Sequence, residues 1–169
     1  MFVVLDRISS RLADAGQWIA MGFLCLLFVL INTEIVSRYL FGRSTLIADE
    51  YGGYLFVGIV FLGMANAMRK GQFLSVDLLV DHLAPRARNA LLATGLTLGS
   101  GLVLVLLVNA ADLVAVSWRF GSVSIQPSAT PLVAPQSLVI VGLAMLLLTY
   151  VAAAVQKWVA FALTFRRAG

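Results

Sequence analysis

The sequence has very few of the residues that bind metals or form covalent bonds to substrates. Its 169 residues include one cysteine, Cys25, and one histidine, His82. One cysteine cannot form a disulfide within a single chain or a thiolate cluster, and one histidine cannot supply the usual pair of axial haem ligands. Phosphate-binding glycine loops, His-Glu-x-x-His, Gly-x-Ser-x-Gly and Cys-x-x-Cys are all absent from the sequence. We therefore expect no enzymatic activity, no cofactor and no metal site.

Charged residues are also scarce. They make up 12% of the chain, whereas 61% of the residues are hydrophobic and the mean hydropathy is +0.97. A soluble domain carries about a quarter charged residues, so the composition indicates an integral membrane protein. The net charge is +4, but the basic residues are scattered between apolar runs instead of forming a stripe, so we expect no nucleic acid partner.

The apolar runs predict an all-α fold, a single membrane domain over residues 1–169. The first run is free of charge for 19 residues, 15–33, enough at ~1.5 Å per residue to cross a hydrocarbon core ~30 Å thick. No small-x-small cleavage site follows this run, so it is interpreted as a retained anchor and not as a signal peptide. The predicted membrane-spanning helices are 15–37, 50–68, 89–116 and 137–163.

Two shorter segments have the pattern of helices that lie on the membrane surface. Residues 2–12 place apolar residues at helical spacing with Asp6, Arg7 and Arg11 between them. Residues 74–84 repeat the pattern, with Asp77 and Asp81 on the polar side. We predict an interfacial helix in each segment.

The distribution of Lys and Arg predicts the orientation. Nine lie in the N-terminal segment, the 69–88 connection and the C-terminal end, and three lie in the other two connections. The positive-inside rule then places both termini in the cytoplasm.

The stretch from Asn32 to Glu50 carries charge between two apolar runs. Glu34 and Arg38 are spaced i,i+4 and can pair on one helix face. Two interpretations remain open: an intrahelical pair at the membrane boundary, or contact with another chain. The candidate partner-contact or structural residues of this stretch are Glu34, Arg38, Tyr39, Arg43, Asp49 and Glu50.

The predicted spans contain little that would move a solute. No charged residue lies at the middle of any span, and the sequence does not have a pair of broken helices in matching halves. We therefore expect this chain to act with another membrane protein.

Several motifs, in this order, resemble those of a known family. Their positions are Glu34-x-x-x-Arg38-Tyr39-x-Phe41, Glu50, Phe61-Leu62-Gly63 with Ala65 and Ala67, Arg69-x-Gly71, and Val76-Asp77. The order resembles the small membrane subunit (DctQ-like) of tripartite ATP-independent periplasmic (TRAP) transporters, over about residues 16–100. Phe73 departs from the pattern, since the family often has histidine there. The 120–137 loop departs as well, because the glycine that often follows its last proline is missing.

This resemblance implies a three-part importer. A periplasmic substrate-binding protein would capture an organic acid of the sialic acid or C4-dicarboxylate type, and a large membrane subunit would carry it inward by sodium symport. The small subunit would be a scaffold for the large one in the bacterial inner membrane. On this basis Arg38, Arg43, Asp49 and Glu50 are expected to form an outward patch that touches one of the two partners.

Two alternatives compete with this interpretation. A dimeric, proton-coupled four-helix exporter needs a carboxylate embedded in its first helix, and Glu34 is the only candidate, close to the end of its apolar run. A respiratory-complex anchor is disfavoured by the lone His82.

Overall fold

The computed structural model describes residues 2–42, 44, 47–71 and 84–166. Four helices account for nearly all of them, and each is long and apolar enough to cross a membrane. The predicted all-α fold with four spanning helices is therefore confirmed. The helices are α1 (Phe2–Phe41), α2 (Ile47–Arg69), α4 (Pro85–Phe120) and α5 (Val133–Arg166).

The first helix differs from the expected pair of segments. α1 is one unbroken helix of 40 residues, so residues 2–12 extend the axis of the spanning helix instead of forming a separate one. The physical reason is local, because residues 12–15 contain neither glycine nor proline and nothing there interrupts the helix. The predicted interfacial helix 74–84 lies outside the described residues except for Ala84, and His82 lies outside them too.

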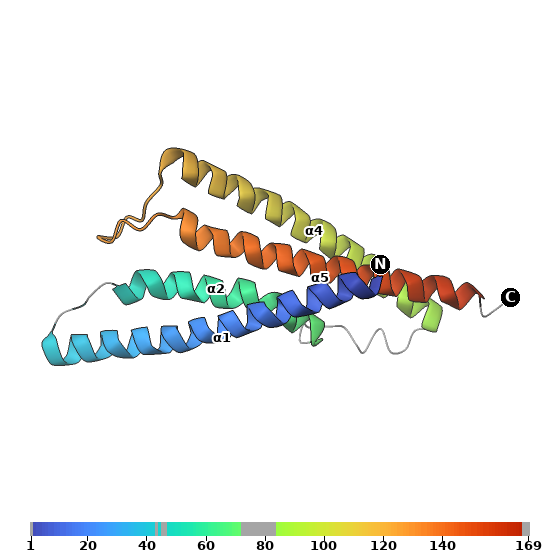
Figure 1. Cartoon of the computed structure of the whole chain (residues 1–169), viewed down its shortest axis with the longest axis horizontal. Coiled ribbons are helices and arrows are strands. Elements are labelled where there is room, and N and C mark those ends of the chain that lie inside the picture. Colours follow the sequence, from blue (N-terminus) through green and yellow to red (C-terminus); the bar gives the residue numbers. More distant parts are fainter. Residues whose placement is uncertain (1, 43, 45–46, 72–83, 167–169) are drawn as a thin grey trace.

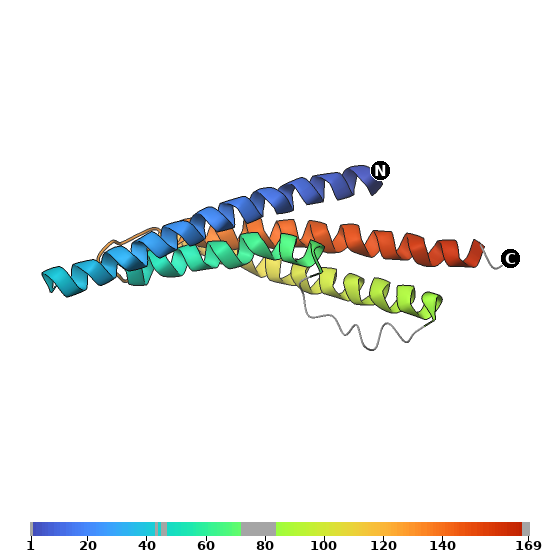
Figure 2. The ribbon, with the colours of Figure 1, turned by 90° about the horizontal axis from the view of Figure 1, so that it is seen from below.

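The helices are arranged in the order α1, α2, α5, α4, with the last helix of the chain between the second and the third (Figure 1, Figure 2). α5 packs on all three others, whereas α4 packs chiefly on α5. Burial follows this order: a third (33%) of the apolar window of α5 is buried, and only 11% of the windows of α1 and α4. The outer helices therefore leave most of their apolar side chains facing outward.

Small residues set the spacing between helices inside the bundle. A Cβ at Gly142 on α5 would overlap the backbone carbonyl of Phe61 on α2, and one at Gly99 on α4 would lie 2.6 Å from the ring of Tyr150. Gly95, the other glycine of the Gly95-x-x-x-Gly99 pattern, has nothing within 4 Å of such a Cβ. Gly142 thus allows α5 to approach α2 closely, and Gly99 allows α4 to approach α5 closely.

The connection from α4 to α5 forms an ordered turn. α4 ends at Phe120, and the next residue, Gly121, has a left-handed φ of 58° and caps the helix by donating its N–H to the Trp118 carbonyl. Val123 and Pro131 then form a bridge, and the Ser124 amide donates to the Thr130 carbonyl at 2.9 Å. The turn is thereby held in shape by its own backbone.

Candidate functional site

Polar side chains gather at the two ends of the bundle. The loop end carries the end of α1, the start of α2 and the connection 121–132, and the terminal end carries the start of α1 and the end of α5 (Figure 1). Between them, the core cluster of Val103, Leu143 and Leu146 is apolar. Each end is built from different residues.

At the loop end, Glu34 lies at the centre of a three-residue network. It is 8% exposed, and its Oε1 accepts from Arg38 Nη2 at 3.2 Å and from Ser44 Oγ at 2.7 Å. Arg38 also donates to Ser44 Oγ at 3.1 Å. The predicted i,i+4 pair is confirmed, and Ser44 joins it from the connection that leads to α2.

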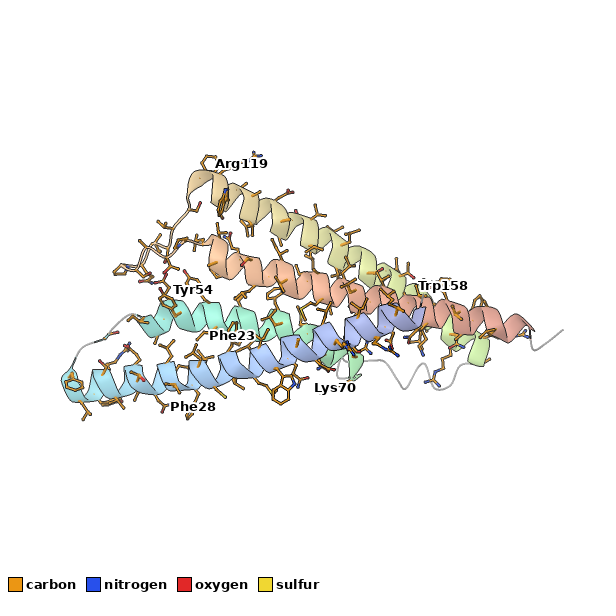
Figure 3. All side chains as sticks on the ribbon, in the orientation of Figure 1. Phe23, Phe28, Tyr54, Lys70, Arg119 and Trp158 are labelled. Carbon is orange, nitrogen blue, oxygen red and sulfur yellow. The ribbon has the colours of Figure 1, made fainter. Side chains whose placement is uncertain are left out.

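Glu50 holds the 121–132 turn against α2. Its carboxylate accepts from Tyr54 OH at 2.9 Å, one turn along α2, and from Ser128 Oγ in the turn. Thr130 in the turn hydrogen-bonds to Tyr51 of α2 at 3.0 Å. Figure 3 shows Tyr54 at the loop end of α2, near the turn that connects α4 to α5. Glu50 is 8% exposed, so it braces the turn and differs from the outward charge expected from the sequence.

Tyr39, Asp49 and the Arg38 side chain are exposed to different degrees. Tyr39 is 85% exposed, Asp49 is exposed, and the Arg38 side chain is 56% exposed. Arg43 lies outside the described residues. The structure therefore brings Glu34 and Arg38 together, turns Glu50 inward and leaves Tyr39 and Asp49 at the surface.

A groove of about 680 Å³ lies between α1 and α2 and is lined in part by Glu34, Arg38, Tyr39 and Asp49. Arg38 and Asp49 are among its charged lining residues, and Leu27, Ile31 and Phe56 are among its apolar ones. A groove with charged and apolar walls can hold an amphipathic segment or an acyl chain.

The terminal end contains a second network that the sequence did not reveal. Arg69 Nη1 donates to Asp6 Oδ1 at 3.1 Å and to Ser9 Oγ at 3.4 Å. Ser9 in turn hydrogen-bonds to Thr149 at 3.1 Å, and both hydroxyl residues are 2% exposed. This network ties α1 to α2 and α5. Local spacing could not predict it, because Ser9 and Thr149 are 140 residues apart.

Two further contacts join α1 to α2 near the same end. Asn66 Nδ2 donates to Asp14 Oδ1 at 3.1 Å, and Lys70 Nζ donates to Gln17 Oε1 at 3.0 Å. Figure 3 shows Lys70 beside α1. Three residues in this half of α1, Asp6, Asp14 and Gln17, thus hydrogen-bond to the end of α2 or to Lys70, the residue that follows it.

No group of three or more His, Cys, Asp or Glu residues that could hold a metal ion occurs in the part of the chain that the structure describes. Several polar residues at the two ends of the bundle form ion pairs and hydrogen bonds between helices or with a connecting turn. The arrangement is that of a braced membrane bundle with polar surfaces at its ends.

Comparison with known proteins gives one family match. Residues 16–160 match the family described as tripartite ATP-independent periplasmic transporters, DctQ component. A Haemophilus influenzae protein, whose description is that of a TRAP transporter small permease protein, is 34% identical over 82 residues. That alignment covers 48% of this chain and 51% of the relative, so it spans about half of each protein. No solved structure matches the chain.

Proposed function

Because this chain belongs to the DctQ component family of tripartite ATP-independent periplasmic transporters, we propose that it is a scaffold for the large membrane subunit of such a transporter. The chain is a multi-pass membrane protein of this small permease family. In the proposal it binds the large subunit in the bacterial inner membrane, with both termini in the cytoplasm.

The observation that carries this proposal is the bracing of the bundle at both ends. Arg69, Asp6, Ser9 and Thr149 link three helices at the terminal end, and Glu50 links α2 to the 121–132 turn at the loop end. Networks whose members are satisfied rigidify a structure. A rigid bundle suits a subunit that stays still while its partner moves the solute.

The loop end is the surface proposed to dock the periplasmic substrate-binding protein. The proposed orientation turns this end outward, and its exposed charges include Arg38 and Asp49. Exposed charges at a docking surface guide the approach of a partner and set its orientation. Asp49→Asn removes one of these charges without touching the Glu34 network; it should slow uptake at low binding-protein concentration and leave the membrane complex intact.

We propose that the solute is an organic acid of the sialic acid or C4-dicarboxylate type, taken up by sodium symport. Sodium and substrate would bind in the large subunit and the binding protein. The middle of this chain is apolar, with Val103, Leu143 and Leu146 at its core. An apolar interior supports the proposal that sodium and substrate bind in the other two proteins.

The proposal is tested by purifying the tagged chain from its native membrane in mild detergent. We expect a large, many-helix permease in about equal amount, identified by mass spectrometry. Deletion of the small chain should abolish sodium-dependent uptake of labelled sialic acid or dicarboxylate, and restoring it should recover uptake. A self-associated chain without that permease would overturn the scaffold proposal and favour the exporter alternative, with Glu34→Gln as its first test.

A further inference from the structure

The outward face of α4 carries a regular stripe of exposed side chains. Its members recur at alternating spacings of four and three residues, the pattern of a helix seam that packs on another helix. Leu98, Leu102 and Val105 are 71%, 63% and 57% exposed. The stripe consists of Leu98, Leu102, Val105, Asn109, Asp112 and Val116.

This stripe points away from the rest of the chain. Val103 and Gly99 lie on the other side of α4, where Val103 is 6% exposed and Gly99 meets Tyr150 of α5. In Figure 3, side chains along the edge of α4 that leads to Arg119 project away from α5. The stripe is therefore a second packing face that no described part of this chain covers.

Asp112 makes this face unsuitable for lipid. It is exposed and makes no ion pair or hydrogen bond within the described residues. Asn109, one turn earlier, turns its amide back to the Val105 carbonyl at 2.7 Å. By contrast, three acidic residues in the other helices, Asp14, Glu34 and Glu50, each have a hydrogen-bond partner.

The end of α4 fits the bilayer poorly at either of two possible depths. Asp112 precedes the end of α4 at Phe120 by eight residues, or about 12 Å along the axis. If the helix end lies at the interface, the carboxylate lies in hydrocarbon, where an unpaired charge is costly. If Asp112 lies among the headgroups, then Trp118 and Phe120, which are 76% and 80% exposed, lie about 9 and 12 Å farther out, at the water side of the interface. A protein partner removes the cost in both cases.

The exposed face of α1 provides the contrast. Its most exposed residues within the apolar run include Trp18 at 73%, Phe28 at 69% and Leu24 at 54%, and Figure 3 shows Phe28 pointing away from the bundle. These side chains are apolar or aromatic and suit lipid directly. The charge on its stripe therefore distinguishes α4 from α1.

We propose that the α4 stripe packs against a transmembrane helix of the large subunit and that this helix presents a basic or hydrogen-bond-donating side chain to Asp112. The proposal rests on the proposed function, since it takes the large subunit as the partner. A second copy of this chain fits less well, because a twofold axis along the membrane normal brings equal depths together. Two Asp112 carboxylates would then repel each other across the interface.

Photo-crosslinking tests which face meets the large subunit. In the full chain co-produced with the large subunit, a benzoyl-phenylalanine replaces Leu102 or Val105 on α4, and Leu24 or Phe28 on α1 as the matched control. We expect cross-links to the large subunit from α4 and none from α1. Cross-links from α1 alone, cross-links between copies of this chain, or no cross-link from either α4 position in an intact complex would each overturn the proposal.

The charge is tested by Asp112→Leu, with Asp49→Leu as the control at an exposed acid on α2. Asp112→Leu should lower recovery of the large subunit at least about tenfold, because it leaves the partner's donor unpaired. The level of the variant in the membrane should stay equal or rise, since leucine suits lipid better. Undiminished recovery with Asp112→Leu, or an equal loss with Asp49→Leu, would overturn the assigned role.

The outcomes separate this inference from the proposed function. If the unaltered chain recovers no large subunit, the proposed function fails. If the complex forms but cross-links only through α1, the scaffold proposal stands and the assignment to α4 fails.

Discussion

At the scale of single residues, a charge inside this bundle is held by at least two neighbours. Glu34 has Arg38 and Ser44, and Glu50 has Tyr54 and Ser128. The second neighbour comes each time from a connection between helices. These carboxylates therefore fix how the loop-end connections meet the helices.

Glu34 and Arg38 are predicted to contribute jointly to the free energy of unfolding. The loss from removing one of them should therefore exceed half of the loss from removing both. Arg38→Leu leaves a carboxylate that is 8% exposed without its cation, and we expect the free energy of unfolding to fall by ~1–3 kcal/mol. Glu34→Leu combined with Arg38→Leu should cost less than the sum of the single changes. Unfolding in mixed micelles, followed by circular dichroism, measures all three variants, and additive single effects would contradict the coupling.

Glu50 and Asp49 are adjacent acids with opposite expected outcomes. Glu50→Gln weakens the bonds to Ser128 and Tyr54 and should lower the free energy of unfolding by ~1–2 kcal/mol, with faster proteolysis of the 121–132 turn. Asp49→Asn changes an exposed residue and should stay within ~0.5 kcal/mol. Equal cleavage rates for the two variants would show that Glu50 does not hold the turn.

Sequence reasoning at this scale succeeded where partners are close along the chain. The Glu34–Arg38 pair follows from helical spacing. The contacts of Glu50 with Ser128 and of Ser9 with Thr149 join residues 78 and 140 positions apart, so they depend on which helices pack together. Neither composition nor local spacing contains that information.

At the scale of elements, the four spans could be predicted because charge-free runs of this length have few other uses. Their ends were predicted less closely, since α4 (Pro85–Phe120) and α5 (Val133–Arg166) each continue by three or four residues beyond both predicted limits. The predicted break in α1 came from the amphipathic pattern of residues 2–12. A pattern of that kind shows which face is polar and does not show where a helix stops.

Helix spacing gives a prediction for two glycines. Gly142→Ala pushes a methyl group into the Phe61 carbonyl and should destabilise the α2–α5 contact by ~1–3 kcal/mol. Gly95→Ala meets open space and should stabilise α4 by ~0.5–1 kcal/mol through helix propensity. Thermal unfolding of the two variants in one detergent compares them, and a stabilising Gly142→Ala would contradict the close approach.

At the scale of the whole molecule, the orientation is a prediction that cysteine labelling tests. In a Cys25→Ser background, Ile125→Cys lies in the loop-end turn and is fully exposed, and Ala84→Cys lies at the other end of α4. An impermeant maleimide added to intact spheroplasts should label residue 125 and leave residue 84 unlabelled until the membrane is opened. The reverse pattern would place both termini outside.

The place of α5 between α2 and α4 has a consequence for biosynthesis. α4 packs chiefly on α5, yet α5 leaves the ribosome after α4. With 46 residues from Phe120 to Arg166, translation at 5–20 residues per second leaves roughly 2 to 9 s between the two helix ends. During that interval the newly inserted α4, with its Asp112 carboxylate, lies in the membrane without the helix on which it packs.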